Sequence, residues 1–168
     1  VLGDPVNFID PIGLWGVGVS VSESTEGGIG VVGAGQTGSA GVAVFGEGFQ
    51  SINTGAVASF GGFAGGPGYG VSSTGGCPNT TNWVLGAFGG GGVNVAFTNA
   101  KKASDLAGPA KTFSFNVAWG LRAASFQVTV GNNNIWSFSY GGPVGPYPTG
   151  AGYGVSASYY NTFTTTTK

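Results

Sequence analysis

Large apolar residues alternate with small or polar residues along most of the chain. Val17, Val19 and Val21 alternate with glycine and serine, and the same two-residue period returns through residues 112–121. Successive side chains of a β-strand point to opposite faces, so this period is typical of strands and not of helices. The chain is therefore predicted to be all-β, with about eight to ten antiparallel strands in a glycine-rich β-barrel or β-sandwich.

Turn-forming residues divide the first third of this pattern into short elements. A turn at residues 23–28 is predicted to separate a first strand from a returning strand at residues 29–35. The next predicted pair is residues 41–49 and 55–63, which the polar residues 50–54 join. These early strands are expected to have about five to nine residues each.

The remainder of the chain has longer alternating runs. Glycines at 89–92 either divide residues 83–97 into two strands or bend one long strand. A short helical turn is predicted at residues 100–106, and Gly108 and Pro109 are expected to end it. A final strand is predicted to start at Tyr153, and residues 162–168 are expected to form a frayed tail.

The alternation alone leaves open which face is buried. If the large apolar face points inward, the chain is a soluble barrel or sandwich. If that face points outward, the chain is a small transmembrane barrel, or the barrel-forming part of a pore, with an interior of Gly, Ser, Thr and Asn. Membrane-crossing strands need ~9–11 residues, and only residues 83–98, 112–121 and 123–131 approach that length in the predicted pattern.

Low charge favours the outward orientation. Only 7% of the residues are charged, compared with roughly 25% in ordinary soluble domains. A charged Arg or Lys on a lipid-facing surface costs ~2–4 kcal/mol near the bilayer midplane. In the membrane interpretation, aromatic residues near strand ends form an interfacial girdle; in the soluble interpretation they are core or rim residues, or stack on a glycan. These aromatic residues are Trp83, Trp136, Tyr140 and Tyr159.

The composition also limits the chemistry that the chain can perform. Its formal net charge is −1, so it lacks the basic field of a nucleic-acid-binding protein, and no nucleic-acid partner is expected. Histidine is absent, which removes the commonest general base and metal ligand. We therefore expect neither a metal ion nor a cofactor. The single cysteine, Cys77, cannot form an internal disulfide.

The N-terminal segment has a different character. Residues 5–14 read Pro-Val-Asn-Phe-Ile-Asp-Pro-Ile-Gly-Leu, an extended run in which each proline restricts the residue before it. This run resembles the closing signature of the core of rearrangement-hot-spot (RHS) and YD-repeat proteins. In that family a hollow repeat shell encloses a variable C-terminal domain, usually a toxin, and releases it by self-cleavage just after the signature.

The resemblance implies a role for each part of the chain. Residues 1–14 would be the end of the shell core, and residues 15–168 a single C-terminal domain of the toxin kind. Asp10 would be one carboxylate of an aspartyl self-cleavage pair, and the cleaved bond would follow Leu14. The partners implied are the parent RHS shell and an immunity protein, and the domain would be a secreted effector that is delivered to a target cell.

Few side chains after the signature are candidates for binding or catalysis. Glu23 and Glu26 flank the predicted turn, as an acid/base pair of the glycosidase kind or as solvated residues of a hairpin tip. Arg122 is the only arginine; it binds an anion, pairs with Glu47, or is a lone exposed or lumen-facing charge. The cluster of Lys101, Lys102 and Lys111 is either a contact for acidic lipid headgroups or the immunity partner, or part of a solvated loop.

These observations leave three hypotheses. The first is a non-enzymatic, membrane-acting toxin domain that inserts or assembles a β-structured pore, and only this hypothesis requires an oligomer. The second is a soluble all-β binding or adhesion module that recognises a glycan or a receptor through exposed aromatic residues. The third is a histidine-independent enzyme that uses Glu23, Glu26 or Glu47.

Overall fold

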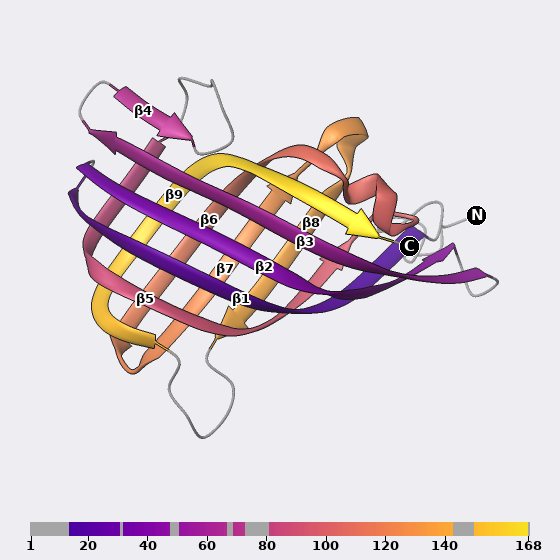
Figure 1. Ribbon diagram of the computed structural model, residues 1–168, viewed down its shortest axis with the longest axis horizontal. Coiled ribbons are helices and arrows are strands. Elements are labelled where there is room, and N and C mark those ends of the chain that lie inside the picture. The colour runs from indigo at the N-terminus through magenta and orange to yellow at the C-terminus, as the bar shows by residue number, and fades with distance from the viewer. Residues whose placement is uncertain are drawn as a thin grey trace, which may run out of the picture.

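The structure is all-β, as the alternation predicts. A computed structural model of the chain describes residues 14–30, 32–47, 51–66, 69–72, 81–142 and 150–167. They form nine strands and two single-turn 3-10 helices (Figure 1). The strands are β1 (Leu14–Gly30), β2 (Val32–Glu47), β3 (Ser51–Gly66), β4 (Tyr69–Ser72), β5 (Thr81–Thr98), β6 (Gly108–Gly120), β7 (Arg122–Val130), β8 (Trp136–Gly142) and β9 (Gly150–Thr167), and the 3-10 helices are η1 (Ala103–Leu106) and η2 (Asn132–Asn134).

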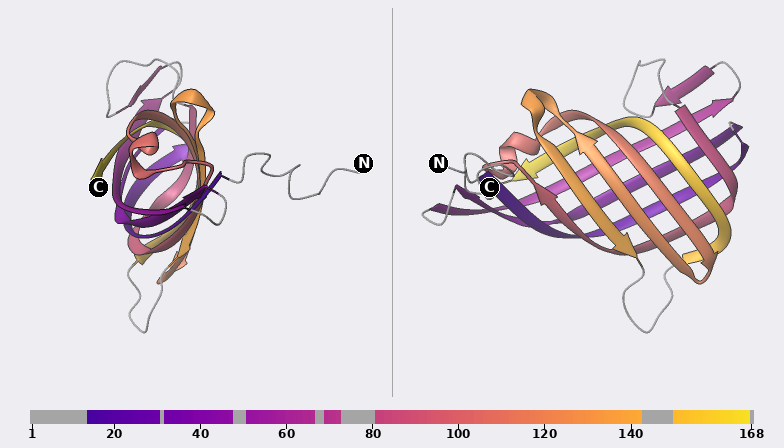
Figure 2. Two further views of the ribbon diagram at one scale, coloured as in Figure 1. Left: turned by 90° about the vertical axis from the view of Figure 1, so that its right-hand side faces the viewer. Right: turned by 180° about the vertical axis from the view of Figure 1, so that it is seen from behind.

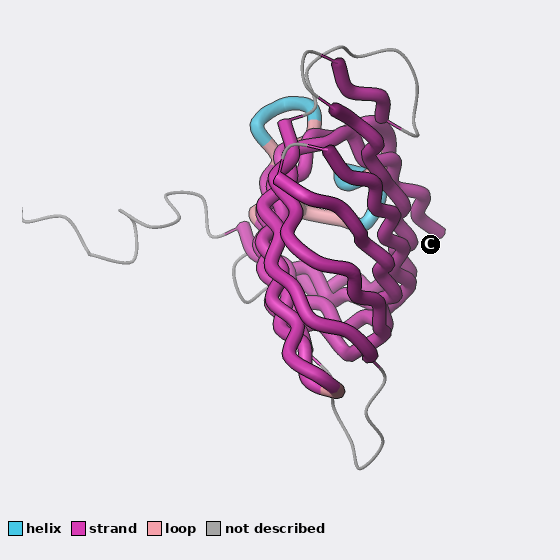
Figure 3. The backbone as a smooth tube through the Cα atoms, turned by 90° about the vertical axis from the view of Figure 1, so that its left-hand side faces the viewer, coloured by secondary structure: helices cyan, strands magenta, loops and turns pink. Residues whose placement is uncertain are grey.

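Eight of these strands form one antiparallel sheet that closes into a ring. The hydrogen-bonded order is β2-β1-β5-β8-β7-β6-β9-β3, and pairing of β3 with β2 closes it; β4 pairs with the end of β3. Strands β1 to β3 run along one diagonal in front, and β6 to β8 run along the other behind (Figure 1). Views along the long axis show a flattened ring instead of an even cylinder (Figure 2, left, and Figure 3).

Strands β5 and β9 join the two layers by belonging to both. One edge of β5 pairs with β1 along most of its length, while its other edge pairs first with β9 and then with β8. Likewise, β9 pairs with β6 on one edge and with β5 and then β3 on the other. Where β5 meets β9, Gly86 and Gly152 have φ values of +108° and +123°, a backbone region that glycine adopts without strain.

The structure corrects two predicted boundaries near the N-terminus. The predicted turn at residues 23–28 is wrong, because β1 continues through it to Gly30. Both edges of this segment are paired: Glu23 lies opposite Gly38 of β2 and Gly91 of β5. The early strands are also longer than predicted, since β1, β2 and β3 have 17, 16 and 16 residues.

The later elements follow the sequence more closely, with one exception. Residues 83–97 belong to one long strand, β5, and the helical turn expected at residues 100–106 is present as η1. The predicted frayed tail is wrong for residues 162–167, which form the end of β9 and pair with β3. This pairing gives the segment a structural role in closing the ring.

Candidate functional site

The large apolar side chains point outward from the ring. Strand β6 shows this most clearly, because Phe113, Phe115 and Val117 alternate on the exposed side with buried Thr112, Ser114 and Asn116 on the inner side. Trp119, on the same outer face, is 77% exposed. The structure thus places the bulky face of the alternating pattern on the outside, which the sequence alone left open.

The outward apolar residues form a continuous band over six neighbouring strands. Register brings Val19 of β1 beside Val42 of β2 and Val95 of β5, and Val95 beside Tyr140 of β8. From there the band continues through the adjacent outer positions of β7 and β6. Its principal members are Val17, Val19, Val21, Val42, Val44, Val93, Val95, Phe97, Phe113, Phe115, Val117, Phe126, Val128, Phe138 and Tyr140, which we call the apolar band.

The band is not uniform around the whole ring. On the β9 and β3 side, the outer positions mix alanine, threonine and Asn161 with scattered larger residues, among them Phe60 and Phe163, whose ring centroids lie 5.8 Å apart. On β1 and β2, the outer face turns polar at Glu23, Thr25 and Gln36. The exterior therefore combines a broad apolar surface with a narrower polar sector.

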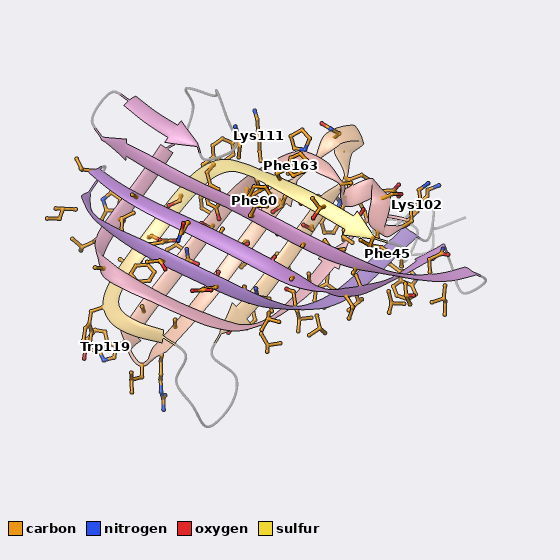
Figure 4. The ribbon with its side chains drawn as sticks, viewed as in Figure 1. Phe45, Phe60, Lys102, Lys111, Trp119 and Phe163 are labelled. Carbon is orange, nitrogen blue, oxygen red and sulfur yellow. The ribbon has the colours of Figure 1, made fainter. Side chains whose placement is uncertain are left out.

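Exposed aromatic residues lie at both ends of the molecule. Trp119 and Tyr153 pack edge to face with centroids 5.6 Å apart, at the end opposite Lys102 (Figure 4). At the Lys102 end, the backbone N–H of Trp136 donates a 2.8 Å hydrogen bond to Asn99. The candidates Trp83, Trp136 and Tyr140 are all exposed, whereas Tyr159 is only half-exposed.

The interior of the ring is lined by small hydroxyl-bearing residues. The Thr112 hydroxyl lies 2.8 Å from that of Thr129 and 2.9 Å from that of Thr162, so one chain of hydroxyls links β7, β6 and β9. On the facing wall, the hydroxyls of Ser39 and Ser59 lie 2.7 Å apart. All eight ring strands contribute residues to a central cavity of about 120 Å³.

A second hollow lies beside this cavity. It has a volume of about 1400 Å³ and opens to solvent. Its border includes inward-facing Ser22 and Ser39 together with outer-face Glu23, Thr25 and Gln36. The polar sector of the exterior therefore adjoins the hydroxyl-lined part of the interior.

Larger side chains fill the ring on either side of the central cavity. At one end, Phe45 is fully buried and packs with Ala43, Ala100 and Ala103, the last of which belongs to η1. Further along β1, beyond the cavity-lining Ser20 and Ser22, the interior is filled by a cluster around Glu26. Both groups of side chains occupy space inside the ring.

The cluster around Glu26 is a buried polar group inside the ring. Glu26 is only 5% exposed, and the Asn116 side-chain amide donates a 2.7 Å hydrogen bond to its Oε1 atom. The same amide lies 3.2 Å from the Ser156 hydroxyl. Ser114, Ser158 and Tyr160 are also buried on the neighbouring inner positions of β6 and β9. We call these six residues the interior oxygen cluster.

The structure separates the two acids that the sequence suggested as a catalytic pair. Glu23 points outward from β1 and is exposed, while Glu26 points inward and is buried. Three residues apart on one strand, they lie on opposite faces. This placement does not bring them to a common pocket.

The other predicted site residues are spread over the molecule. Lys101 and Lys102 are exposed beside η1, Lys111 is exposed at the start of β6, and Arg122 is exposed at the start of β7. Both backbone N–H groups of Lys101 and Lys102 donate to the Asp105 carboxylate, at 3.1 and 3.2 Å. Asp10, Cys77 and the side chain of Glu47 lie outside the described residues.

Sequence reasoning missed the interior oxygen cluster. The signal was present in the parity of β1, because Ser20, Ser22, Ser24 and Glu26 occupy one face of an unbroken strand. The predicted turn at residues 23–28 ends the alternation before Glu26, so the sequence pattern does not assign Glu26 to the inner face. The partner of Glu26, Asn116, lies 90 residues away in the sequence, and no local pattern indicates that contact.

The comparisons with known proteins give no relative for this chain. No protein-family model, curated protein or solved structure matches it. Within the described ranges, no helix is long and apolar enough to cross a membrane. The same ranges contain no group of three or more His, Cys, Asp or Glu residues placed to hold a metal ion.

Proposed function

We propose that residues 15–168 are the membrane-acting effector domain of an RHS-repeat protein, which inserts the apolar outer face of its β-ring into a lipid bilayer. The observation that carries this proposal is the polarity of the ring: bulky apolar side chains point outward and hydroxyl-bearing side chains point inward. This is the arrangement that a bilayer stabilises, because lipid solvates the apolar face and the interior keeps its polar groups hydrogen-bonded.

The apolar band is difficult to reconcile with an uncovered protein in water. Soluble monomers rarely expose contiguous apolar patches larger than a few hundred Å². Here the outward residues include Val19, Val42 and Phe97, which are 50%, 67% and 48% exposed. They lie on β1, β2 and β5, which are neighbours in the sheet. Covering such a surface with lipid is favourable by roughly 25 cal/mol of free energy for each Å² of apolar area that is removed from water.

Strand length supports the same proposal. Six of the eight ring strands, β1, β2, β3, β5, β6 and β9, have 13 or more residues, and ~9–11 tilted residues are enough to cross a bilayer. Strands β7 and β8, with 9 and 7 residues, are the shortest of the ring. Closure of the ring leaves no unpaired sheet edge for lipid to contact along most of the wall.

The filled interior limits what the inserted domain does. Eight-stranded barrels have interiors just wide enough to be filled by side chains, and here Phe45 and the interior oxygen cluster lie on either side of a cavity of about 120 Å³. We therefore propose leakage of small ions through or around the inserted ring, and not a wide pore. The assignment of residues 15–168 as a toxin domain rests on the resemblance of residues 5–14 to the RHS signature.

Three measurements on one vesicle preparation test this function. Purified protein is mixed with phosphatidylglycerol/phosphatidylcholine vesicles, and flotation and the release of potassium and of an encapsulated large dye are recorded. We expect co-flotation and potassium release, with the large dye retained. Protein that stays at the bottom of the gradient while micromolar amounts leave potassium gradients intact would contradict the proposal. Retention on a glycan array by such a lipid-indifferent monomer would instead favour the binding-module hypothesis.

A further inference from the structure

Three buried oxygen atoms inside the ring find no hydrogen-bond partner among the described residues. They are Oε2 of Glu26, Oγ of Ser114 and Oγ of Ser158. The three residues are 5%, 0% and 1% exposed. Buried polar atoms are almost always partnered in folded proteins, so three of them within one cluster indicate a further polar group between them.

These atoms come from facing walls of the ring, Glu26 from β1 and the two serines from β6 and β9. Ser114 of β6 and Ser158 of β9 are directly opposite each other in the register, and the next inward pair is Asn116 and Ser156. That second pair binds Glu26 from β1, because the Asn116 amide contacts both the Glu26 carboxylate and the Ser156 hydroxyl. The Tyr160 phenol borders the cluster and faces Ser114, although these two do not meet the geometry of a hydrogen bond.

The chemistry of the cluster indicates what the further group is. The three unpartnered atoms are all oxygens. Oxygen atoms are the ligands that hard cations prefer, and zinc or copper sites seldom use them alone. The inward positions described on β2, β3, β5, β6 and β9 carry no Lys or Arg, so no basic side chain there balances the Glu26 carboxylate. One carboxylate balances one positive charge, whereas a divalent ion would leave a net charge buried.

We propose that the interior oxygen cluster binds a single dehydrated monovalent alkali cation, with Glu26 Oε2 as the charged ligand and the hydroxyl oxygens of Ser114 and Ser158 as neutral ligands. The ion links β1 to β6 and β9 across the interior of the ring. It thereby satisfies the three atoms and holds the layers together. This site does not depend on insertion of the outer face into lipid.

Sodium-dependent stability tests the proposal directly. The purified chain is unfolded thermally in increasing sodium chloride, and in N-methylglucamine chloride at equal ionic strength. We expect the unfolding midpoint to rise and saturate with sodium and not with the organic cation, because only sodium binds the folded state. The ²³Na resonance should broaden in the presence of the protein. A potassium series shows which alkali ion the cluster prefers.

Variants on the same strand provide the control. Glu26→Gln removes the charge and is expected to abolish the sodium response, whereas Glu23→Gln, on the outer face of β1, should retain it. Ser114→Ala combined with Ser158→Ala should weaken the apparent sodium affinity at least tenfold, and this variant decides the question if Glu26→Gln does not fold. Equal responses to sodium and N-methylglucamine, or an unchanged apparent sodium affinity in the serine variant, would overturn the proposal.

Discussion

Asn116 illustrates how a single side chain holds the interior of this ring. Its amide donates to the buried Glu26 carboxylate at 2.7 Å and lies within 3.2 Å of Ser156, so it connects β1, β6 and β9. A buried carboxylate that loses a hydrogen-bond donor keeps the cost of its desolvation without compensation. The energetic role of Asn116 is therefore coupled to the charge of Glu26.

We predict that Asn116→Ala lowers the free energy of unfolding by about 2–3 kcal/mol. In a Glu26→Gln background the same substitution should cost less, with a coupling energy of about 1 kcal/mol or more, because no charge is then left unpaired. Denaturant unfolding of the four proteins of this double-mutant cycle measures the coupling. Gln127→Ala, at another interior position, serves as the control, and equal losses in both backgrounds would mean that Asn116 acts by packing alone.

Gly86 is a second residue whose chemistry the fold requires. Its φ is +108°, and a Cβ atom there would collide with the carbonyl oxygen of Tyr153 on β9. We predict that Gly86→Ala destabilises the fold by at least ~1–3 kcal/mol, the usual cost of a strained backbone conformation. Gly27→Ala is the matched control, because its Cβ would lie 3.7 Å from that of Ala87. Comparable urea midpoints for the two variants would contradict the close approach of β5 and β9.

At the scale of elements, the period of two predicted most strands but not their ends. The parity of Val17, Val19 and Val21 continues through residues 23–28, whose Glu, Ser, Thr and Gly composition resembles a turn. Pairing with β2 on one edge and β5 on the other keeps this segment extended, because tertiary pairing overrides weak local preference. The threonine-rich end of β9 is ordered for the same reason, through pairing with β3.

The same limit applies to the candidate site. The alternation correctly separated bulky from small faces, and both orientations satisfied it equally well, because period alone contains no information about curvature. Closure into a ring determines the outcome: small residues such as Ser39, Ser59 and Thr112 fit the inner side, and large aromatic side chains fit the outer side. The interior oxygen cluster needs contacts between β1 and β6, which only the three-dimensional arrangement supplies.

A charge in the middle of the apolar band should separate membrane insertion from folding. Val95 on β5 lies between Val19 and Tyr140, and we predict that Val95→Arg reduces vesicle flotation strongly, since a lipid-facing arginine costs ~2–4 kcal/mol. Thr25→Arg, on the outer face beside Glu23 and Gln36, should have little effect. Circular dichroism confirms that both variants are folded. Equal flotation of the two would show that the apolar band does not contact lipid.

At the scale of the whole molecule, the ring depends on a strand that comes last in the chain. The two layers meet through β5 and β8 on one side and through β9 and β3 on the other. Residues 162–167 supply the β9 part of the second junction, with Phe163 against Phe60 outside and Thr162 bonded to Thr112 inside. Without this C-terminal segment, residues 56–61 of β3 would have no pairing partner on that edge.

Truncation of this segment tests the closure. We predict that a chain ending at Asn161 loses slow amide exchange in residues 56–61 of β3 by tenfold or more, because the backbone groups of that edge no longer pair with β9. The unpaired edge should also make this variant aggregate. A chain ending at Thr165 retains Phe163 and Thr164 and should keep most of the protection. If both truncations exchange alike, the ring closes without the β3–β9 junction, and the flattened barrel is held by β5 and β9 instead.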